Sequence, residues 1–327
     1  MVILLGLLAI AGILLAKLMH HNYRSLRRDI HAITSVSGKY DRPRERASVF
    51  GILDPYDHPG QYRKAQLHLH TANSIDVREK RPIADTLSDY RRAGYAFVVV
   101  TDHDRVTDCT ELGWPDLIVI PGVEETVRFL MWPFGKHLLR IGLNAEAPLL
   151  APAHLSWRGN LGTGTWHLSE LLKRQDYQLV EIYNEKSDLM IDVWLWHILA
   201  VKRGFRNPVW AIAVDDSDNG RPLDRGWIMI KTPDLSRESF LNALKQGSFY
   251  ATTGPLADFG VRGQAICVVC AENTSIRFID ARNEVVAVSR GGVAKYEPTG
   301  EEGFIRVEVT NIDGHMAWSQ PFFLLPD

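Results

Sequence analysis

The chain has 327 residues, with 37 Lys and Arg against 39 Asp and Glu, so its formal net charge is −2. Its 46% apolar and 23% charged residues exclude a disordered chain, and its 3 cysteines exclude a disulfide scaffold. The balanced charge argues against nucleic-acid binding driven by a positive surface, so no nucleic-acid partner is expected.

The first predicted element is a transmembrane anchor at residues 1–19. Residues 2–16 carry no charge, and the apolar stretch approaches the length that crosses a hydrocarbon core of about 30 Å. A cleaved signal peptide and a buried N-terminal helix are the alternatives. Basic residues follow this stretch, and Lys and Arg near a span tend to stay cytoplasmic. The sequence therefore predicts a single-pass protein of the cell membrane whose globular part is cytoplasmic.

Residues 20–60 are predicted to be a basic juxtamembrane segment and linker. Pro43, Pro55, Pro59 and Gly60 interrupt any helix there. The basic side chains suit contact with anionic lipid headgroups, and a solvated linker explains them equally well.

Residues 61–255 alternate between strand and helix patterns. Strands are predicted at 64–70, 96–101, 117–121, 138–143, 149–153, 179–183, 209–214 and 227–231. Helices are predicted at 83–93, 168–174, 188–203 and 236–246, the last with Ser236 as its N-cap and Gly247 at its end. Such alternation predicts a parallel sheet or a barrel. Residues 256–327 lack helical periodicity and predict a small all-β domain, with strands at 265–270, 275–279, 285–288, 304–309 and 322–325.

Histidines and carboxylates lie at or just past the ends of successive predicted strands, and one histidine follows a glycine turn. These residues are His68 and His70, then Asp102 and His103, then Glu124, His137 and His154, and finally Asp215, Asp216 and Asp218. Residues i and i+2 of a strand face the same side, so the imidazoles of His68 and His70 should converge. A solvated face would explain that pair alone, but not the recurrence. The residue types supply mixed nitrogen and oxygen ligands, so the pattern predicts a site for several divalent metals.

The same motifs resemble a known superfamily. LHLHT, TDHD, GVEET, GKH, PAH and VDDSD, in this order and spacing, resemble the PHP (polymerase and histidinol phosphatase) domain. The segments DPYDHPGQYRKAQLHLHT, VEIYN and GSFYATTGP resemble its CehA/McbA-like branch more closely. The resemblance covers about residues 50–325.

This resemblance implies an α/β fold: a distorted seven-stranded (β/α) barrel over 61–255 with metals at its C-terminal mouth. The metal ligands that it implies are His68, His70, Asp76, His103, Glu124, His137, His154, Asp216 and Asp218. Glu124 matches the carboxylate that bridges two metals in the family. Two departures stand out, because Ile75 separates Ser74 from Asp76, and Asp218 replaces the usual His and favours harder ions.

The implied mechanism is metal-assisted hydrolysis with two or three divalent ions, Mn, Fe or Zn, that activate water. The predicted catalytic residues are His103 or His154 as the proton donor to the leaving group, with Asp102, like Asp215, orienting a ligand imidazole. Arg158, Arg221 and Arg225 are candidates for binding an anionic substrate, and Trp132 and Trp157 for lining its pocket.

The predicted function is therefore a membrane-anchored, metal-dependent phosphoesterase that acts on a small molecule such as a phosphate ester. One alternative is a hydrolase of carboxylic esters, carbamates or amides with the same centre. Another is a non-catalytic barrel that serves as a binding module. The sequence has neither a phosphate-cradling GxxxxGK[ST] loop nor a serine-hydrolase elbow.

Overall fold

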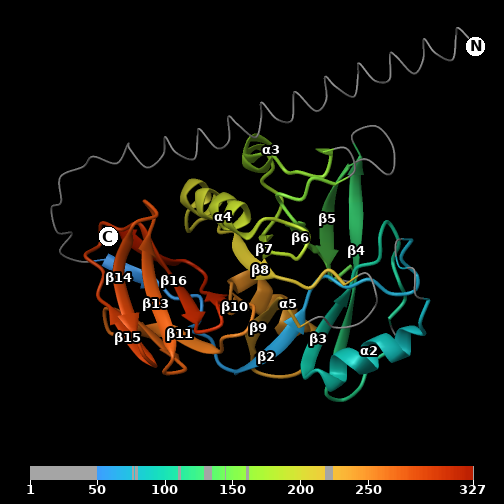
Figure 1. The fold of residues 1–327 in the computed structure, drawn as a ribbon, viewed down its shortest axis with the longest axis horizontal. Helices are drawn as coiled ribbons and strands as arrows, with labels where there is room; N and C mark the ends of the chain where they lie inside the picture. Colours follow the sequence, from blue (N-terminus) through green and yellow to red (C-terminus); the bar gives the residue numbers. More distant parts are fainter. Residues whose placement is uncertain are drawn as a thin grey trace, which may run out of the picture.

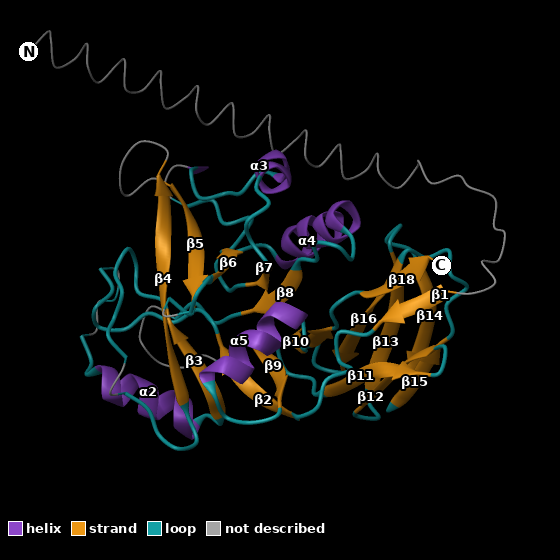
Figure 2. Ribbon diagram, turned by 180° about the vertical axis from the view of Figure 1, so that it is seen from behind, coloured by secondary structure: helices purple, strands orange, loops and turns teal. Residues whose placement is uncertain are grey.

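The structure, a computed structural model, describes residues 50–75, 77, 80–109, 112–128, 135–143, 145–159, 162–217 and 224–326. Strands dominate this part of the chain (Figure 2). Its helices are α2 (Ile83–Arg92), α3 (Leu168–Lys173), α4 (Leu189–Arg203) and α5 (Arg237–Gln246). The strands of the first part are β1 (Phe50–Leu53), β2 (Gln61–Gln66), β3 (Tyr95–Val100), β4 (Ile118–Arg128), β5 (Gly135–Ile141), β6 (Leu149–Pro152), β7 (Leu179–Tyr183), β8 (Trp210–Ala213), β9 (Trp227–Thr232) and β10 (Phe249–Thr252). The C-terminal strands are β11 (Ala257–Arg262), β12 (Ala265–Cys270), β13 (Thr274–Asp280), β14 (Val285–Arg290), β15 (Val293–Tyr296), β16 (Phe304–Asn311), β17 (Met316–Trp318) and β18 (Phe322–Pro326).

One large mixed sheet runs through the molecule. Its main path is β1-β18-β16-β17-β10-β9-β2-β3-β4-β5-β6, and β13 and β14 extend it from β16. Strands β7 and β8 form a separate parallel pair, and β11, β12 and β15 form a three-stranded antiparallel sheet. The C-terminal strands gather at one end of the molecule and β2 to β6 at the other (Figure 1).

The prediction of a seven-stranded (β/α) barrel is wrong. Within the large sheet only β2 with β3 and β3 with β4 are parallel, and β4, β5 and β6 pair antiparallel in sequence order. Antiparallel neighbours need only a short connection, whereas each parallel crossover needs a dozen residues or more, usually a helix. The described residues therefore hold many strands and only four helices, and β10 joins the C-terminal strands directly through β17.

The predictions of a membrane helix and of a membrane location are also corrected. In the described part of the chain, no helix combines the length and the apolar character needed to cross a bilayer. The predicted anchor at residues 1–19 lies outside the described residues.

Local signals account for the helices that the sequence does predict. The Ser236 hydroxyl accepts a hydrogen bond from Ser239 N at the start of α5, and Gly247 ends that helix in the left-handed region with φ of 73°. Asp188 caps α4 in the same way, through bonds from the backbone of Met190 and Ile191. All three positions confirm the predicted helix boundaries to within one residue.

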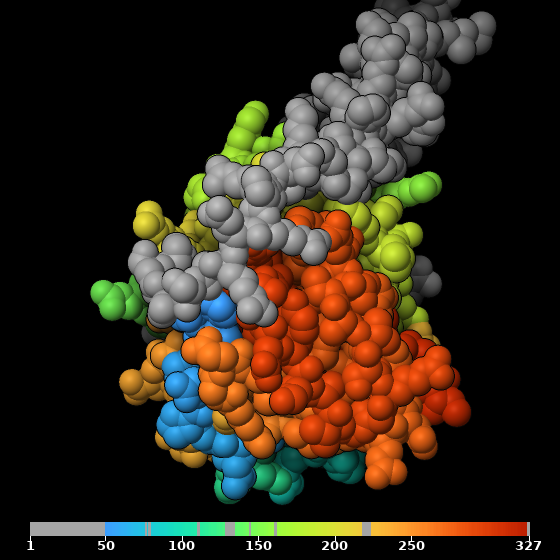
Figure 3. Space-filling view, turned by 90° about the vertical axis from the view of Figure 1, so that its left-hand side faces the viewer, coloured from blue at the N-terminus to red at the C-terminus, as the bar shows by residue number. Residues whose placement is uncertain are grey.

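Buried apolar side chains join the two ends of the molecule. One cluster contains Phe97 of β3 and Phe240 of α5, whose rings stack with centroids 4.7 Å apart. It also contains Phe304 and Phe323 from C-terminal strands. The first and last strands, β1 and β18, pair antiparallel, and Figure 3 shows the first described residues beside the C-terminal strands on that surface. This shared core holds the strand ends that carry the histidines.

Candidate metal centre

Seven of the predicted ligands come together in one buried cluster. His68 and His70 follow β2, His103 follows β3, Glu124 lies within β4 and His137 within β5, His154 follows β6, and Asp216 follows β8. Two further bridges hold these segments in register, a parallel one between Leu69 and Ser217 and another between His103 and Glu124. Two strands and the segments that follow four others thus bring ligands to one place.

A first group of ligand atoms lies around His68 and His70. The Nε2 atoms of these two histidines are 3.2 Å apart. They lie 3.2 Å (His68) and 3.3 Å (His70) from Oε2 of Glu124. Oδ1 of Asp216 lies 3.3 Å from His68 Nε2 and 3.2 Å from His70 Nε2. Two imidazole nitrogens and two carboxylate oxygens therefore face one point, as the ligands of a divalent cation do.

A second group shares Glu124 with the first. Nδ1 of His103 lies 3.1 Å from Oε2 of Glu124, and Nδ1 of His137 lies 2.8 Å from its Oε1. His154 adds a third nitrogen, with Nε2 at 3.1 Å from the same Oε1. Each group could hold a metal ion, and Glu124 belongs to both. One carboxylate between two ligand sets is an arrangement suited to a pair of ions.

The cluster is built to hold positive charge. Oε2 of Glu124 is buried, and nitrogens of His68, His70 and His103 lie 3.2, 3.3 and 3.1 Å from it. Burial would raise the pKa of Glu124, but His68, His103 and His137 hold it well below its usual value. Burial would likewise lower the pKa of His70, but hydrogen bonds to Asp216 and Glu124 raise it to about 9. Divalent metal cations would also supply positive charge beside these buried carboxylates, so the nitrogen and oxygen ligands fit such ions.

A buried carboxylate that the sequence analysis missed orients two of these ligands. Oε1 of Glu181, in β7, accepts a hydrogen bond from Nδ1 of His68 at 2.7 Å, and Oε2 accepts the backbone N–H of His154 at 2.5 Å. Asn184 donates from Nδ2 both to Oε2 of Glu181 at 2.9 Å and to Oδ2 of Asp216 at 3.0 Å. With its Nδ1 occupied, His68 presents the lone pair of Nε2 to the cluster.

The two carboxylates predicted to orient imidazoles are bound to other groups. Asp102 accepts hydrogen bonds from the backbone and hydroxyl of Thr71, at 2.6 and 2.7 Å, and from the hydroxyl of Thr107. Asp215 accepts from the backbone N–H groups of residues 224–226. Both therefore organise the loops that surround the cluster.

The predicted substrate-binding residues lie partly outside the described chain. Arg158 is exposed, and Arg225 pairs with Glu185. Trp157 contacts the rings of His137 and His154, with centroids 5.2 and 4.7 Å away, so it covers one side of the second group. The predicted ligands and contacts that lie outside the described residues are Asp76, Asp218, Arg221 and Trp132.

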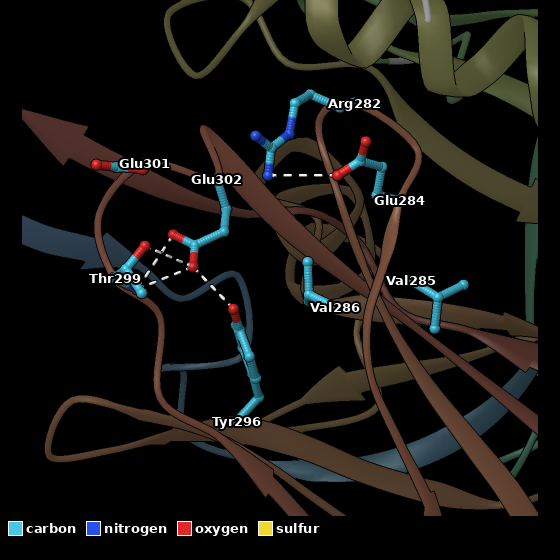
Figure 4. A pocket seen from close by; sticks show the side chains of 8 residues that line it. All are labelled: Arg282, Glu284, Val285, Val286, Tyr296, Thr299, Glu301 and Glu302. Atoms are coloured by element: carbon cyan, nitrogen blue, oxygen red, sulfur yellow. Dashed lines mark hydrogen bonds and ion pairs between the residues drawn. The ribbon is translucent and has the colours of Figure 1, made fainter. Parts of the chain in front are cut away.

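A separate pocket of about 470 Å³ lies between β14 and the loop after β15 (Figure 4). Most of its polar side chains already have partners. Glu302 accepts hydrogen bonds from Tyr296 Oη and from Thr299, and Arg282 pairs with Asp280 and Glu284. We therefore assign the candidate chemistry to the histidine cluster.

Comparisons with known proteins find only distant likenesses. No family model matches the sequence, and no curated protein matches it. Among solved structures, the chain is similar to a two-domain protein from Bacteroides vulgatus that contains a predicted PHP-like metal-dependent phosphoesterase. That match has 14% identity and a TM-score of 0.45, and it covers 86% of this chain and 99% of that one. The chain is also similar to PsfC from Pseudomonas syringae, with 11% identity, coverage of 53% and 83%, and a TM-score of 0.38.

Proposed function

We propose that this chain is a metal-dependent hydrolase that cleaves phosphate esters of small molecules. The observation that carries the proposal is the placement of Glu124 between two sets of imidazoles in a buried cluster. The motifs that resemble the PHP domain agree with it. A pair of adjacent cations suits phosphoryl transfer, because the attacking and leaving oxygens each need charge stabilisation.

The ligand sets divide between the two groups. His68, His70 and Asp216 would hold one ion, His103, His137 and His154 the other, and Glu124 would contact both. Divalent ions bound there would lower the pKa of a coordinated water and polarise the ester, which supplies a nucleophile at neutral pH. Glu181 keeps His68 in the tautomer that accepts an ion.

The remaining roles follow from exposure. The side chain of His103 is 13% exposed and that of His154 is 2% exposed, so His103 is the more accessible of the two predicted proton donors. Its Nδ1 faces Glu124, so His103 would donate a proton to the leaving group only when that nitrogen does not hold an ion. Trp157 limits water access to His137 and His154.

Elemental analysis of the full chain, purified without chelators, tests the proposal first. We expect two or three Mn, Fe or Zn ions per chain, and we expect Glu124→Gln to lose metal from both groups. His315→Ala, on an exposed loop, is the control and should keep the wild-type content. Negligible metal after reloading would contradict the proposal and favour a non-catalytic binding role.

A substrate panel then tests the reaction class. Chromogenic phosphate monoesters and diesters are compared with aryl carbamates and carboxylic esters. We expect hydrolysis of the phosphate esters and its loss in His68→Ala. Turnover of carbamates or carboxylic esters alone would refute the phosphoesterase assignment and leave the metal-dependent hydrolase standing.

A further inference from the structure

Lys186 lies at the edge of the metal cluster. Nζ of Lys186 lies 3.0 Å from Oδ1 of Asp216, the oxygen that also faces His68 and His70. The side chain of Lys186 is 29% exposed, whereas that of Asp216 is 1% exposed. The ammonium group therefore lies between the buried ligands and the solvent.

The loop that carries this lysine is ordered by its own hydrogen bonds. The backbone N–H of Lys186 donates to Oδ1 of Asn184 at 2.9 Å, and Ser187 N donates to the carbonyl of Asn184 at 3.1 Å. Asn184 also holds Oδ2 of Asp216. One residue thus orders both the turn that bears Lys186 and the carboxylate that the lysine contacts.

The charge that Lys186 faces at Asp216 would change if the cluster held a cation. An ion held by Asp216 would share the negative charge of that carboxylate with Lys186. An ammonium group beside a site that holds cations repels further positive charge and attracts a negatively charged oxygen. Among the predicted anion-binding residues that the structure describes, Arg158 is exposed and Arg225 pairs with Glu185, whereas Lys186 contacts a predicted metal ligand directly.

We propose that Lys186 is the residue that binds an anionic oxygen of the substrate and so selects phosphorylated over neutral esters. This inference rests on the proposed function and adds the substrate charge that the site recognises. Lys186 acts by binding, through a hydrogen bond from Nζ to a non-bridging oxygen. It supplies no metal ligand.

The test compares Lys186→Gln and Lys186→Arg with the wild-type chain, all loaded with Mn²⁺. Lys202→Gln, at an exposed position of α4, is the matched control. Three quantities are measured: the dissociation constant for Mn²⁺, the inhibition constant of inorganic phosphate, and KM for p-nitrophenyl phosphate and for the neutral p-nitrophenyl acetate.

The expected effects run in opposite directions. Lys186→Gln should weaken phosphate binding and raise KM for the phosphate ester by roughly tenfold or more, the range for one charge-assisted hydrogen bond. It should bind Mn²⁺ at least as tightly as wild type, because a like charge beside Asp216 is gone. Any KM for the acetate ester should not move, and Lys186→Arg should restore most phosphate binding. A purely structural role would weaken Mn²⁺ and phosphate binding together.

The failures are distinguishable. Unchanged phosphate inhibition and unchanged KM in Lys186→Gln, with metal content and phosphatase activity intact, would overturn this inference and leave the proposed function in place. Parallel loss of Mn²⁺ and phosphate affinity would also overturn it, in favour of a structural role. A wild-type chain that binds none of Mn²⁺, Fe²⁺ and Zn²⁺ would overturn both.

Discussion

Glu181→Gln is the substitution that tests most directly how the cluster is organised. The change is isosteric and removes one negative charge from a side chain that is fully buried. In the wild-type chain both carboxylate oxygens accept hydrogen bonds, Oε1 from His68 and Oε2 from His154 N and Asn184. A glutamine has one acceptor oxygen, so one of these positions must become a donor.

The geometry decides which position changes. Two N–H donors, from His154 and Asn184, converge on Oε2, so the amide oxygen belongs there and the amide NH₂ faces His68 Nδ1. His68 must then accept at Nδ1 and carry its proton on Nε2, which points at Glu124 and Asp216. That tautomer cannot bind a cation. Because loss of such an orienting partner typically weakens metal binding 10- to 100-fold, we expect a loss of about 1.4 to 2.8 kcal/mol.

Isothermal titration of the metal-free chain with Mn²⁺ or Zn²⁺ measures this effect. Glu284→Gln is the matched control, since its side chain is 61% exposed and lies in a C-terminal strand connection. Circular dichroism of the metal-free proteins reports whether the fold survives. Wild-type affinity in a folded Glu181→Gln chain would refute the argument that Glu181 sets the tautomer of His68.

Three further predictions concern stability. Chelation should lower the melting temperature of the metal-loaded chain. An ion present at 100 times its dissociation constant stabilises the folded state by about 2.7 kcal/mol. An unchanged melting temperature after chelation would argue against bound metal. His197 accepts from Arg306 at Nδ1, and burial and then this guanidinium lower its pKa to about 3. In the unfolded chain the imidazole takes up a proton near pH 6.5, whereas in the folded chain it stays neutral down to about pH 3. The free energy of unfolding should therefore fall by about 2 kcal/mol between neutral pH and pH 5. Urea unfolding of His197→Asn should show a smaller pH dependence. Phe240→Ala should reduce the free energy of unfolding by about 3 to 5 kcal/mol, because Phe240 is buried and stacks on Phe97. Ile312→Ala is the control, because its side chain is 82% exposed, and it should change that free energy by less than about 0.5 kcal/mol in the same urea titration.

The elements of the fold were more predictable than their pairing. Helices α2, α4 and α5 and most strands follow from local periodicity and capping residues, and they lie within a few residues of the predicted ranges. The pairing of β4 with β5, or of β10 with β17, depends on residues far along the chain. Strand β1 fell within the predicted linker because its four residues have a weak pattern and gain their order from β18. A regular alternation of strands and helices thus suggested a barrel that the pairing does not form.

The site shows the same division between local and distant information. The spacing of His68 and His70 pointed to a shared face, and their Nε2 atoms do converge. The acidic neighbours of histidines in sequence, such as Asp102, turned out to bond elsewhere, while Glu181 contacts His68 from 113 residues away. One signal could have identified Glu181: it is a charged residue in the middle of the apolar strand LVEIY, and such a residue needs a buried partner.

Backbone conformation shows why these partners matter together. His154 and Asp216 are non-glycine residues with positive φ, 31° and 48°, a conformation that costs of order 1–3 kcal/mol each and persists only where the surroundings impose it. Glu181 holds the backbone N–H of His154, and Asn184 links Glu181 to the carboxylate of Asp216. One buried pair, Glu181 and Asn184, therefore connects strained positions from two different strand ends. Glycine at either strained position would relieve the backbone but remove the ligand atom, so the chain keeps the strain at the residues whose side chains face the cluster.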